Sequence, residues 1–263
     1  MKALISVFRL RLREELQYRG AVIGGVFCQT FFGLILISVY RALYETRPQT
    51  LPLQDVVTYV WLQQAFFRML VAFDGELNDK VRTGGFAYDL CRPLDTYGYY
   101  FSRGAAQKLM GSILRSVPML IIAILLPEGW RIGAPASVSG LVCALISLGF
   151  GLMCVCALDM ITTGFTVRTL DSRGMQSALN LLMVTLSGNL LPLTLFPDSW
   201  QNVIRLLPYA QLLDAPIRLY CGQQSVSGAP AVWLCQAVWT VLLVLLGRKF
   251  WSSNRKRIVV QGG

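Results

Sequence analysis

Few side chains in this sequence could carry out chemistry. It contains no histidine, so acid–base catalysis by an imidazole is excluded. Its 7 cysteines form no CxxC pair and most lie within apolar runs, which predicts packing rather than disulfides or zinc binding. No GxxxxGK(S/T) phosphate-binding loop is present. We therefore expect a chain that is not an enzyme, that has no catalytic or metal-binding residues, and that binds no cofactor itself.

The ionisable side chains within or at the end of apolar segments include Arg68, Arg115 and Asp159. Asp159 is near the end of its segment, so hydration is the simpler explanation for its charge. Each arginine either extends its guanidinium to the membrane surface or faces a watery cavity, where it meets an anionic substrate or a carboxylate. Because no carboxylate is expected at mid-membrane, coupling of transport to protons or sodium ions is disfavoured.

Uncharged polar side chains also occur in the apolar segments. Such residues either line a path for a substrate or make hydrogen bonds between helices, and for any single residue the second role is the commoner one. As a group they favour a centre that solvent or substrate can reach. Together with Arg68, the candidates for a substrate path are Gln29, Gln63, Asn180 and Asn189.

The surrounding composition is that of a membrane protein. Hydrophobic residues make up 54% and charged residues 14% of the 263 residues, whereas a soluble domain carries about 25% charged residues. A helix needs about 20 mainly apolar residues to cross the hydrocarbon layer. We therefore predict an all-α membrane protein that forms a single domain, 1–263, with six transmembrane helices. These span residues 20–43, 56–73, 105–126, 138–161, 176–195 and 231–251.

The basic residues indicate how the predicted helices are oriented. Most of the 24 Lys and Arg residues fall in segments on the same side of the membrane as the N-terminus. Because basic loops stay in the cytoplasm, both termini are predicted to be cytoplasmic. The same bias accounts for the net charge of +10, so we expect membrane lipid but no nucleic acid as a partner.

Three segments outside the predicted helices differ in character. Residues 1–19 place Leu4 and Leu12 on one face and basic residues on the other, which predicts an amphipathic helix in the membrane surface rather than a cleavable signal. Residues 74–104 form a polar cytoplasmic loop. Residues 196–228 are apolar and interrupted by prolines, which favours a re-entrant helical hairpin in the outer leaflet over an ordinary extracellular loop.

The cytoplasmic loop carries apolar side chains among charged ones. A short helix there is expected to expose Phe86, Tyr88 and Leu90. Exposed aromatic side chains tend to mark contact surfaces. The loop is therefore predicted to dock a cytoplasmic protein.

In these features the sequence resembles the permease subunits of type-2 ATP-binding-cassette (ABC-2) exporters. The resemblance rests on the string Gly85–Leu94 with its Arg-Pro-Leu ending, on Ser187-Gly188, and on the prolines between the last two predicted helices. It covers almost the whole chain and is nearest to the small permeases of drug, viologen-like or peptide export systems. By this resemblance, the residues that couple the chain to an ATPase are Gly85, Phe86, Tyr88, Asp89, Leu90, Arg92 and Pro93.

The resemblance also implies an assembly and an activity. Two permeases, this chain and an identical or related six-span one, would join two separate ATPase subunits that hold ATP and Mg²⁺. Closure of the ATPases would move the coupling loop and the N-terminal helix, and so open a path lined by the first, second and fifth transmembrane helices. The chain is then a multi-pass protein of the bacterial cytoplasmic (inner) membrane that exports an amphipathic drug, peptide or lipid-like compound.

Two other classes of protein fit parts of this sequence. One is a secondary carrier or channel without an ATPase, which the shortage of buried carboxylates disfavours. The other is a membrane protein that transports nothing, such as an assembly factor or an integral enzyme. The lack of histidine and of clustered acids disfavours the enzyme.

Overall fold

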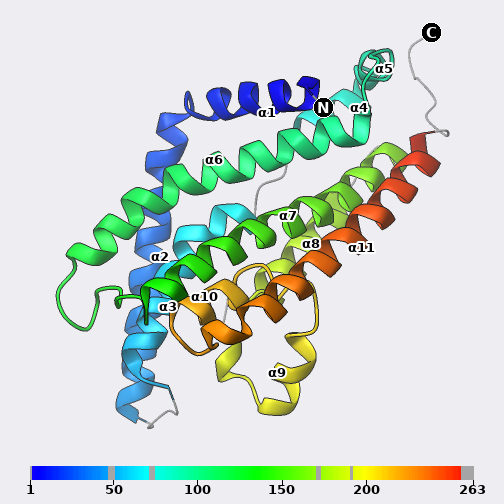
Figure 1. Cartoon of the computed structure of the whole chain (residues 1–263). Helices are drawn as coiled ribbons and strands as arrows, with labels where there is room; N and C mark the ends of the chain where they lie inside the picture. The colour runs from blue at the N-terminus through cyan, green and yellow to red at the C-terminus, as the bar shows by residue number, and fades with distance from the viewer. Residues whose placement is uncertain (1, 47–50, 71–74, 170–172, 190–191, 256–263) are drawn as a thin grey trace.

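The computed structural model describes residues 2–46, 51–70, 75–169, 173–189 and 192–255. Helices are the only regular elements in these described ranges (Figure 1). Their bounds are α1 Lys2–Glu15, α2 Arg19–Thr46, α3 Leu53–Leu70, α4 Gly75–Arg82, α5 Phe86–Leu90, α6 Thr96–Leu125, α7 Val138–Thr169, α8 Arg173–Leu186, α9 Asp198–Ile204, α10 Asp214–Tyr220 and α11 Ala229–Arg255. Short 3-10 turns cover Leu193–Leu195 and Val226–Gly228. The predicted all-α class is confirmed for the part of the chain that is described.

Four helices are long and apolar enough to cross a membrane: α2, α6, most of α7, and α11 with the turn before it. The other two predicted transmembrane segments are helical but do not reach this standard. α3 carries Asp55, three glutamines and Arg68 within 18 residues. α8 has 14 residues, about 21 Å at 1.5 Å per residue, against a hydrocarbon thickness of about 30 Å. Six crossings therefore do not follow from helix length and composition.

The predicted fifth segment, 176–195, extends too far. α8 ends at Leu186, and Gly188 follows with φ of 79°. That conformation is open to glycine but costly for other residues, so it turns the chain out of the helix. A Cβ on Gly188 would also lie 2.5 Å from the Tyr59 hydroxyl. The turn is thus fixed both by its backbone and by close contact with α3.

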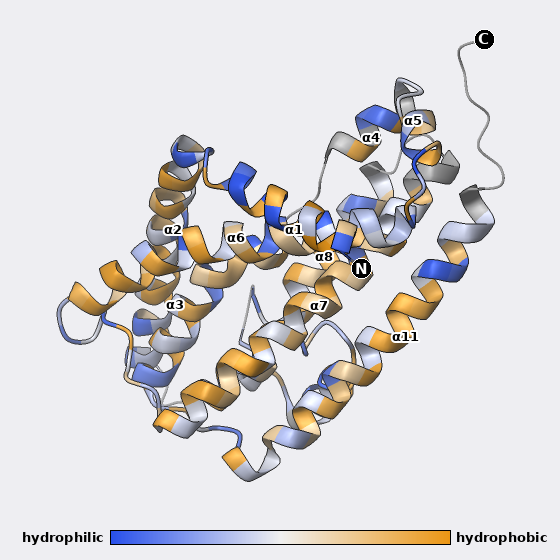
Figure 2. Cartoon of the chain, turned by 45° about the horizontal axis from the view of Figure 1, so that its top comes forward, coloured by the Kyte–Doolittle hydropathy of each residue, from blue (hydrophilic) through white to orange (hydrophobic). Residues whose placement is uncertain are grey.

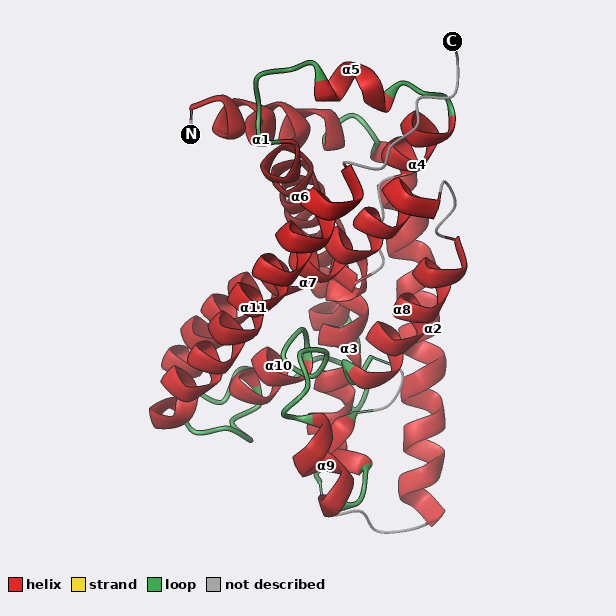
Figure 3. Cartoon of the chain, turned by 90° about the vertical axis from the view of Figure 1, so that its right-hand side faces the viewer, coloured by secondary structure: helices red, strands yellow, loops and turns green. Residues whose placement is uncertain are grey.

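α1 lies across one end of the bundle and packs along the first half of α6 (Figure 1). Its apolar side chains divide between the two sides of the helix. Phe8 packs against the main core, whereas Ile5 and Leu10 are exposed. A helix buried on one side and apolar on part of the other suits a position in the membrane surface. α4 and α5 lie at the same end as α1, and α9 lies at the opposite end (Figure 3).

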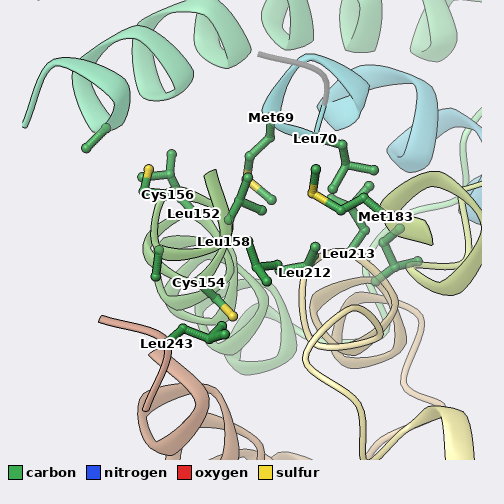
Figure 4. Close-up of a cluster of buried hydrophobic side chains, with 14 of the residues drawn as sticks. Met69, Leu70, Leu152, Cys154, Cys156, Leu158, Met183, Leu212, Leu213 and Leu243 are labelled. Atoms are coloured by element: carbon green, nitrogen blue, oxygen red, sulfur yellow. The ribbon is translucent and has the colours of Figure 1, made fainter. Parts of the chain in front are cut away.

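The main core is formed by α3, α7, α8, α11 and the turn that precedes α10 (Figure 4). Gln236 of α11 is fully buried, and its Nε2 donates to Ser147 Oγ of α7 at 2.9 Å and to the Gln211 carbonyl at 2.8 Å. A Cβ on Gly151 would lie 2.7 Å from the Leu212 carbonyl oxygen, so the glycine permits the turn to approach α7. All seven cysteines are free, and Cys143, Cys154 and Cys156 are buried packing residues.

The outer faces of the long helices remain apolar (Figure 2). On α2, Phe27 is 76% exposed and Ile23 70% exposed. On α11, Leu234, Leu245 and Leu246 are likewise exposed. Exposed apolar surface of this extent is unusual for a soluble monomer and normal where lipid is the solvent. The arrangement of apolar side chains is therefore that of a multi-pass membrane protein.

Candidate functional site

α5 is anchored by the aromatic side chain of Phe86. Gly84, with φ of 76°, makes the turn between α4 and α5. Phe86 is 2% exposed, and its ring lies 6.2 Å from that of Tyr100 in α6 and 6.1 Å from that of Trp251 in α11. The expectation that Phe86 is exposed is therefore wrong. The reason is long-range: its neighbours in sequence are charged, but its neighbours in space are aromatic side chains of two long helices.

Asp89 anchors α5 through polar contacts. Its carboxylate is buried and accepts hydrogen bonds from Tyr100 Oη at 2.6 Å and Lys80 Nζ at 3.0 Å, with Arg92 Nε at 3.7 Å. Burial raises the pKa of Asp89, but the bonds from Tyr100 and Lys80 outweigh burial and hold the pKa below its usual value. An ionised Asp89 thus links α4, α5 and the start of α6.

The surface left free on this segment is small. Tyr88 is 78% exposed, and Arg92 and Pro93 are also exposed. Leu90 packs partly against the aromatic cluster, and Gly85 is partly buried. Of the three apolar residues predicted to be exposed, only Tyr88 has a largely exposed side chain. The seven predicted coupling residues are therefore divided into an outward surface and an anchoring set beneath it.

The helices beneath α5 are also joined to one another. Asp95 caps α6 by accepting a hydrogen bond from the Gly98 amide at 3.2 Å, and Arg248 Nη2 of α11 lies 3.4 Å from its carboxylate. Trp251 Nε1 donates to Thr96 Oγ1 at 3.1 Å. α5 thus contacts two helices, α6 and α11, that are also joined to each other.

The structure brings two of the predicted path residues together. Gln63 of α3 and Asn189, just after α8, are both buried, and Asn189 Nδ2 donates to the Gln63 carbonyl oxygen at 3.4 Å. Gln29 of α2 and Asn180 of α8 are half-buried, and within the described residues neither is hydrogen-bonded to this pair. Among the five predicted path residues, a hydrogen bond within the described residues joins Gln63 and Asn189 alone, and the common path stays a prediction.

Arg68 and Arg115 face the contact between α6 and its neighbours. A Cβ on Gly111 of α6 would lie 3.5 Å from Arg68 Cγ, so the Arg68 side chain crosses that helix at a glycine. Arg115 lies over Gly25 in the same way and donates from Nη2 to the Ala21 carbonyl at 3.2 Å. The Arg115 side chain is therefore occupied by α2 backbone.

Asp159 is not simply hydrated, as the sequence suggested. Its Oδ2 lies 2.8 Å from Lys108 Nζ, and Lys108 is 1% exposed. The same ammonium donates to the Met69 carbonyl at 3.0 Å. The charge of Asp159 is satisfied by an ion pair between α7 and α6, and the pair also fixes the end of α3.

A second buried ion pair was missed from the sequence. Asp214 is fully buried at the start of α10 and binds Arg218 Nε at 2.8 Å and the Tyr59 hydroxyl at 2.6 Å. The i,i+4 spacing of Asp214 and Arg218 was a usable signal. The sequence predicted a re-entrant helical hairpin for residues 196–228 but no buried ion pair within it. The network joins α10 to α3 beside the Gln63–Asn189 contact.

Comparison with protein families gives one decisive match. Residues 27–262 match the model of the family described as "ABC-2 family transporter protein". The chain belongs to the ABC-2 transporter family. The match begins within α2 and includes α5, the buried Asp214–Arg218 pair and α11. A comparison with curated proteins finds none that matches. The ABC-2 chain is therefore a membrane component of a transporter, a kind of chain that is in general not catalytic.

Proposed function

We propose that this chain is the permease subunit of an ATP-driven exporter. It pairs with a second permease, identical or related, and two separate ATPase subunits supply the energy by binding ATP and Mg²⁺. The complex lies in the bacterial cytoplasmic membrane, with α1, α5 and both chain ends in the cytoplasm. α3 and α8 complete six crossings with the four long helices. The cargo is an amphipathic drug, peptide or lipid-like compound.

The observation that carries this proposal is that the side chains of α5 and of the residues just after it divide into an exposed set and a buried set. Tyr88, Arg92 and Pro93 face outward, while Phe86 and Asp89 lock the same short helix to α6 and α11. A docking surface that is anchored to two long helices can pass the motion of a partner to those helices. Such a partner shifts the conformational equilibrium only through contacts that differ between the two states. In this assignment Tyr88, Arg92 and Pro93 touch the ATPase, and Gly85, Phe86, Asp89 and Leu90 position them.

The proposed path follows the polar contact between α3 and the turn after α8. Gln63 and Asn189 contribute buried polar groups there, and the Nε2 atom of Gln63 has no hydrogen-bond partner in the described residues. Gln29, Asn180 and Arg68 join the path when the helices move apart. Its few polar groups among apolar helices suit an amphipathic cargo.

The docking surface is tested by Tyr88→Ala and Arg92→Glu in the full chain, purified from its native membrane together with the proteins that it binds. Loss of an exposed aromatic hot spot costs about 2 kcal/mol of binding, or about 30-fold in affinity. We expect each variant to lose co-purification of the ATPase and vanadate-sensitive ATP hydrolysis. Tyr18→Ala serves as the control, because Tyr18 is 61% exposed at the α1–α2 corner, away from α5.

Two experimental outcomes would contradict the proposal. If Tyr88→Ala and Arg92→Glu retain the ATPase as the Tyr18→Ala control does, α5 is not the docking surface. If the unmodified chain purifies alone and supports transport in vesicles that hold an ion gradient but no ATP, the proposal fails as a whole and a secondary carrier takes its place.

A further inference from the structure

A groove lies between α6 and α7 on the side of the molecule away from α1. Its outer part is a cavity of about 930 Å³ beneath the loop that joins the two helices. Leu62 of α3 and Tyr220 of α10 form its floor, and Leu120 and Leu141 form its walls. The same four residues also line a narrower slot of about 80 Å³ that runs on between the helices. The cavity and the slot are therefore parts of one continuous groove.

The slot offers no free polar group. Its other lining residues are apolar: Phe66, Ala144, Leu145, Leu148, Pro216 and Ile217. The one hydroxyl, that of Tyr220, is used to donate to the Gly133 carbonyl at 3.0 Å. At about 80 Å³ the slot admits the end of a thin hydrocarbon chain but not the side of another helix.

The mouth of the groove carries one charge of each sign. Arg131 Nη2 and Glu128 Oε1 lie 3.2 Å apart, and their side chains are 52% and 87% exposed. Both residues line the cavity, as does Gln54 at the start of α3, whose Nε2 donates to the Arg131 carbonyl at 2.9 Å. An exposed pair of this kind contributes little to stability, so its charges remain available to a ligand.

We propose that this groove binds one zwitterionic membrane phospholipid of the leaflet opposite α1. The end of one acyl chain enters the slot and the rest lies in the cavity, the phosphate binds Arg131, and the ammonium group binds Glu128. The volume of the groove is within the range of about 300–1,000 Å³ that is usual for ligand sites. The site is distinct from the proposed path at Gln63 and Asn189 and does not depend on an ATPase partner.

The test is native mass spectrometry of the full chain, purified in mild detergent, stripped of lipid and titrated with phosphatidylethanolamine. Leu120→Trp fills the groove from α6 and Leu145→Trp fills the slot from α7. We expect each to weaken binding of one lipid about tenfold, the equivalent of about two buried methylene groups. Ile121→Trp is the matched control, because Ile121 is 53% exposed on α6 and does not line the groove.

The headgroup contacts are tested without changing the core. Arg131→Gln should weaken phosphatidylethanolamine about tenfold, as expected for the loss of one charge-assisted contact, whereas Lys249→Gln at the far end of α11 should not. The proposal is overturned if Leu120→Trp and Leu145→Trp, folded as judged by thermal unfolding, bind lipid as Ile121→Trp does. It is also overturned if Arg131→Gln binds normally, or if the groove takes up a cationic amphipathic dye in preference to the phospholipid.

Discussion

At the scale of single residues, the charges inside this protein are paired rather than free. Asp159 binds Lys108 between α7 and α6, and Asp214 binds Arg218 within α10. In both cases one partner is completely or almost completely buried. Removing one member of such a pair leaves a charge in a medium that solvates it poorly. These residues therefore determine how the helices fit together, whatever their part in transport.

Arg218→Met should be strongly destabilising. Among the described residues it leaves the buried Asp214 with the Tyr59 hydroxyl alone as a side-chain partner, and breaking a buried pair costs about 3–5 kcal/mol. Thermal or denaturant unfolding in detergent measures the loss. Arg131→Met is the control, since it breaks an exposed pair worth about 0–1 kcal/mol. The double variant Asp214→Asn/Arg218→Met should recover part of the loss, and equal effects of Arg218→Met and Arg131→Met would contradict this account.

Asp89 should make stability depend on pH in the acid range. Because its pKa is below the ordinary value in the folded protein, ionised Asp89 stabilises the fold above the unfolded pKa of about 3.9. That stabilisation is lost as the pH falls through the folded pKa. Asp89→Asn should thus be less stable than the unmodified chain at pH 7, with a difference that shrinks below about pH 4. Asp79→Asn, at an exposed position of α4, should show no such difference.

At the scale of helices, sequence periodicity and apolar length predicted where the helices lie. They did not predict which residues contact one another across helices. Each of the six predicted segments contains a helix, because apolar runs of that length have few other solutions in a membrane. The burial of Phe86 depends on Tyr100 and Trp251, and the pairing of Asp159 depends on Lys108. Contacts between residues so distant in sequence have no local pattern, so neither was predicted.

Gly151 tests how the hairpin before α11 is attached. Gly151→Val should displace the turn at Leu212, because the added Cβ would lie 2.7 Å from its carbonyl oxygen, a group that cannot move without α10. We expect faster hydrogen exchange in residues 208–220 and a loss of about 1–3 kcal/mol, typical of overpacking. Gly149→Val, two residues away with no atom within 4 Å, is the control. Similar exchange in both variants would show that the hairpin is held elsewhere.

At the scale of the whole molecule, the number of crossings decides which parts of the chain share a compartment. α3 is covered on nearly every side by protein, with ten consecutive buried residues from Val56 to Ala65. A helix shielded in this way has no need of the apolar composition that lipid contact demands, since its polar groups meet protein. α3 can therefore cross the membrane although its composition alone does not require it.

Reporter fusions distinguish six crossings from four. If α3 crosses, a fusion after Arg92 is cytoplasmic and one after Arg131 is on the far side, so a fluorescent protein reports at the first position and alkaline phosphatase at the second. If only α2, α6, α7 and α11 cross, the two positions exchange compartments. With a cytoplasmic N-terminus, as the distribution of basic residues predicts, we expect the first pattern. The second would place α5 outside the cell, beyond reach of any cytoplasmic ATPase, and would refute the proposed coupling through Tyr88.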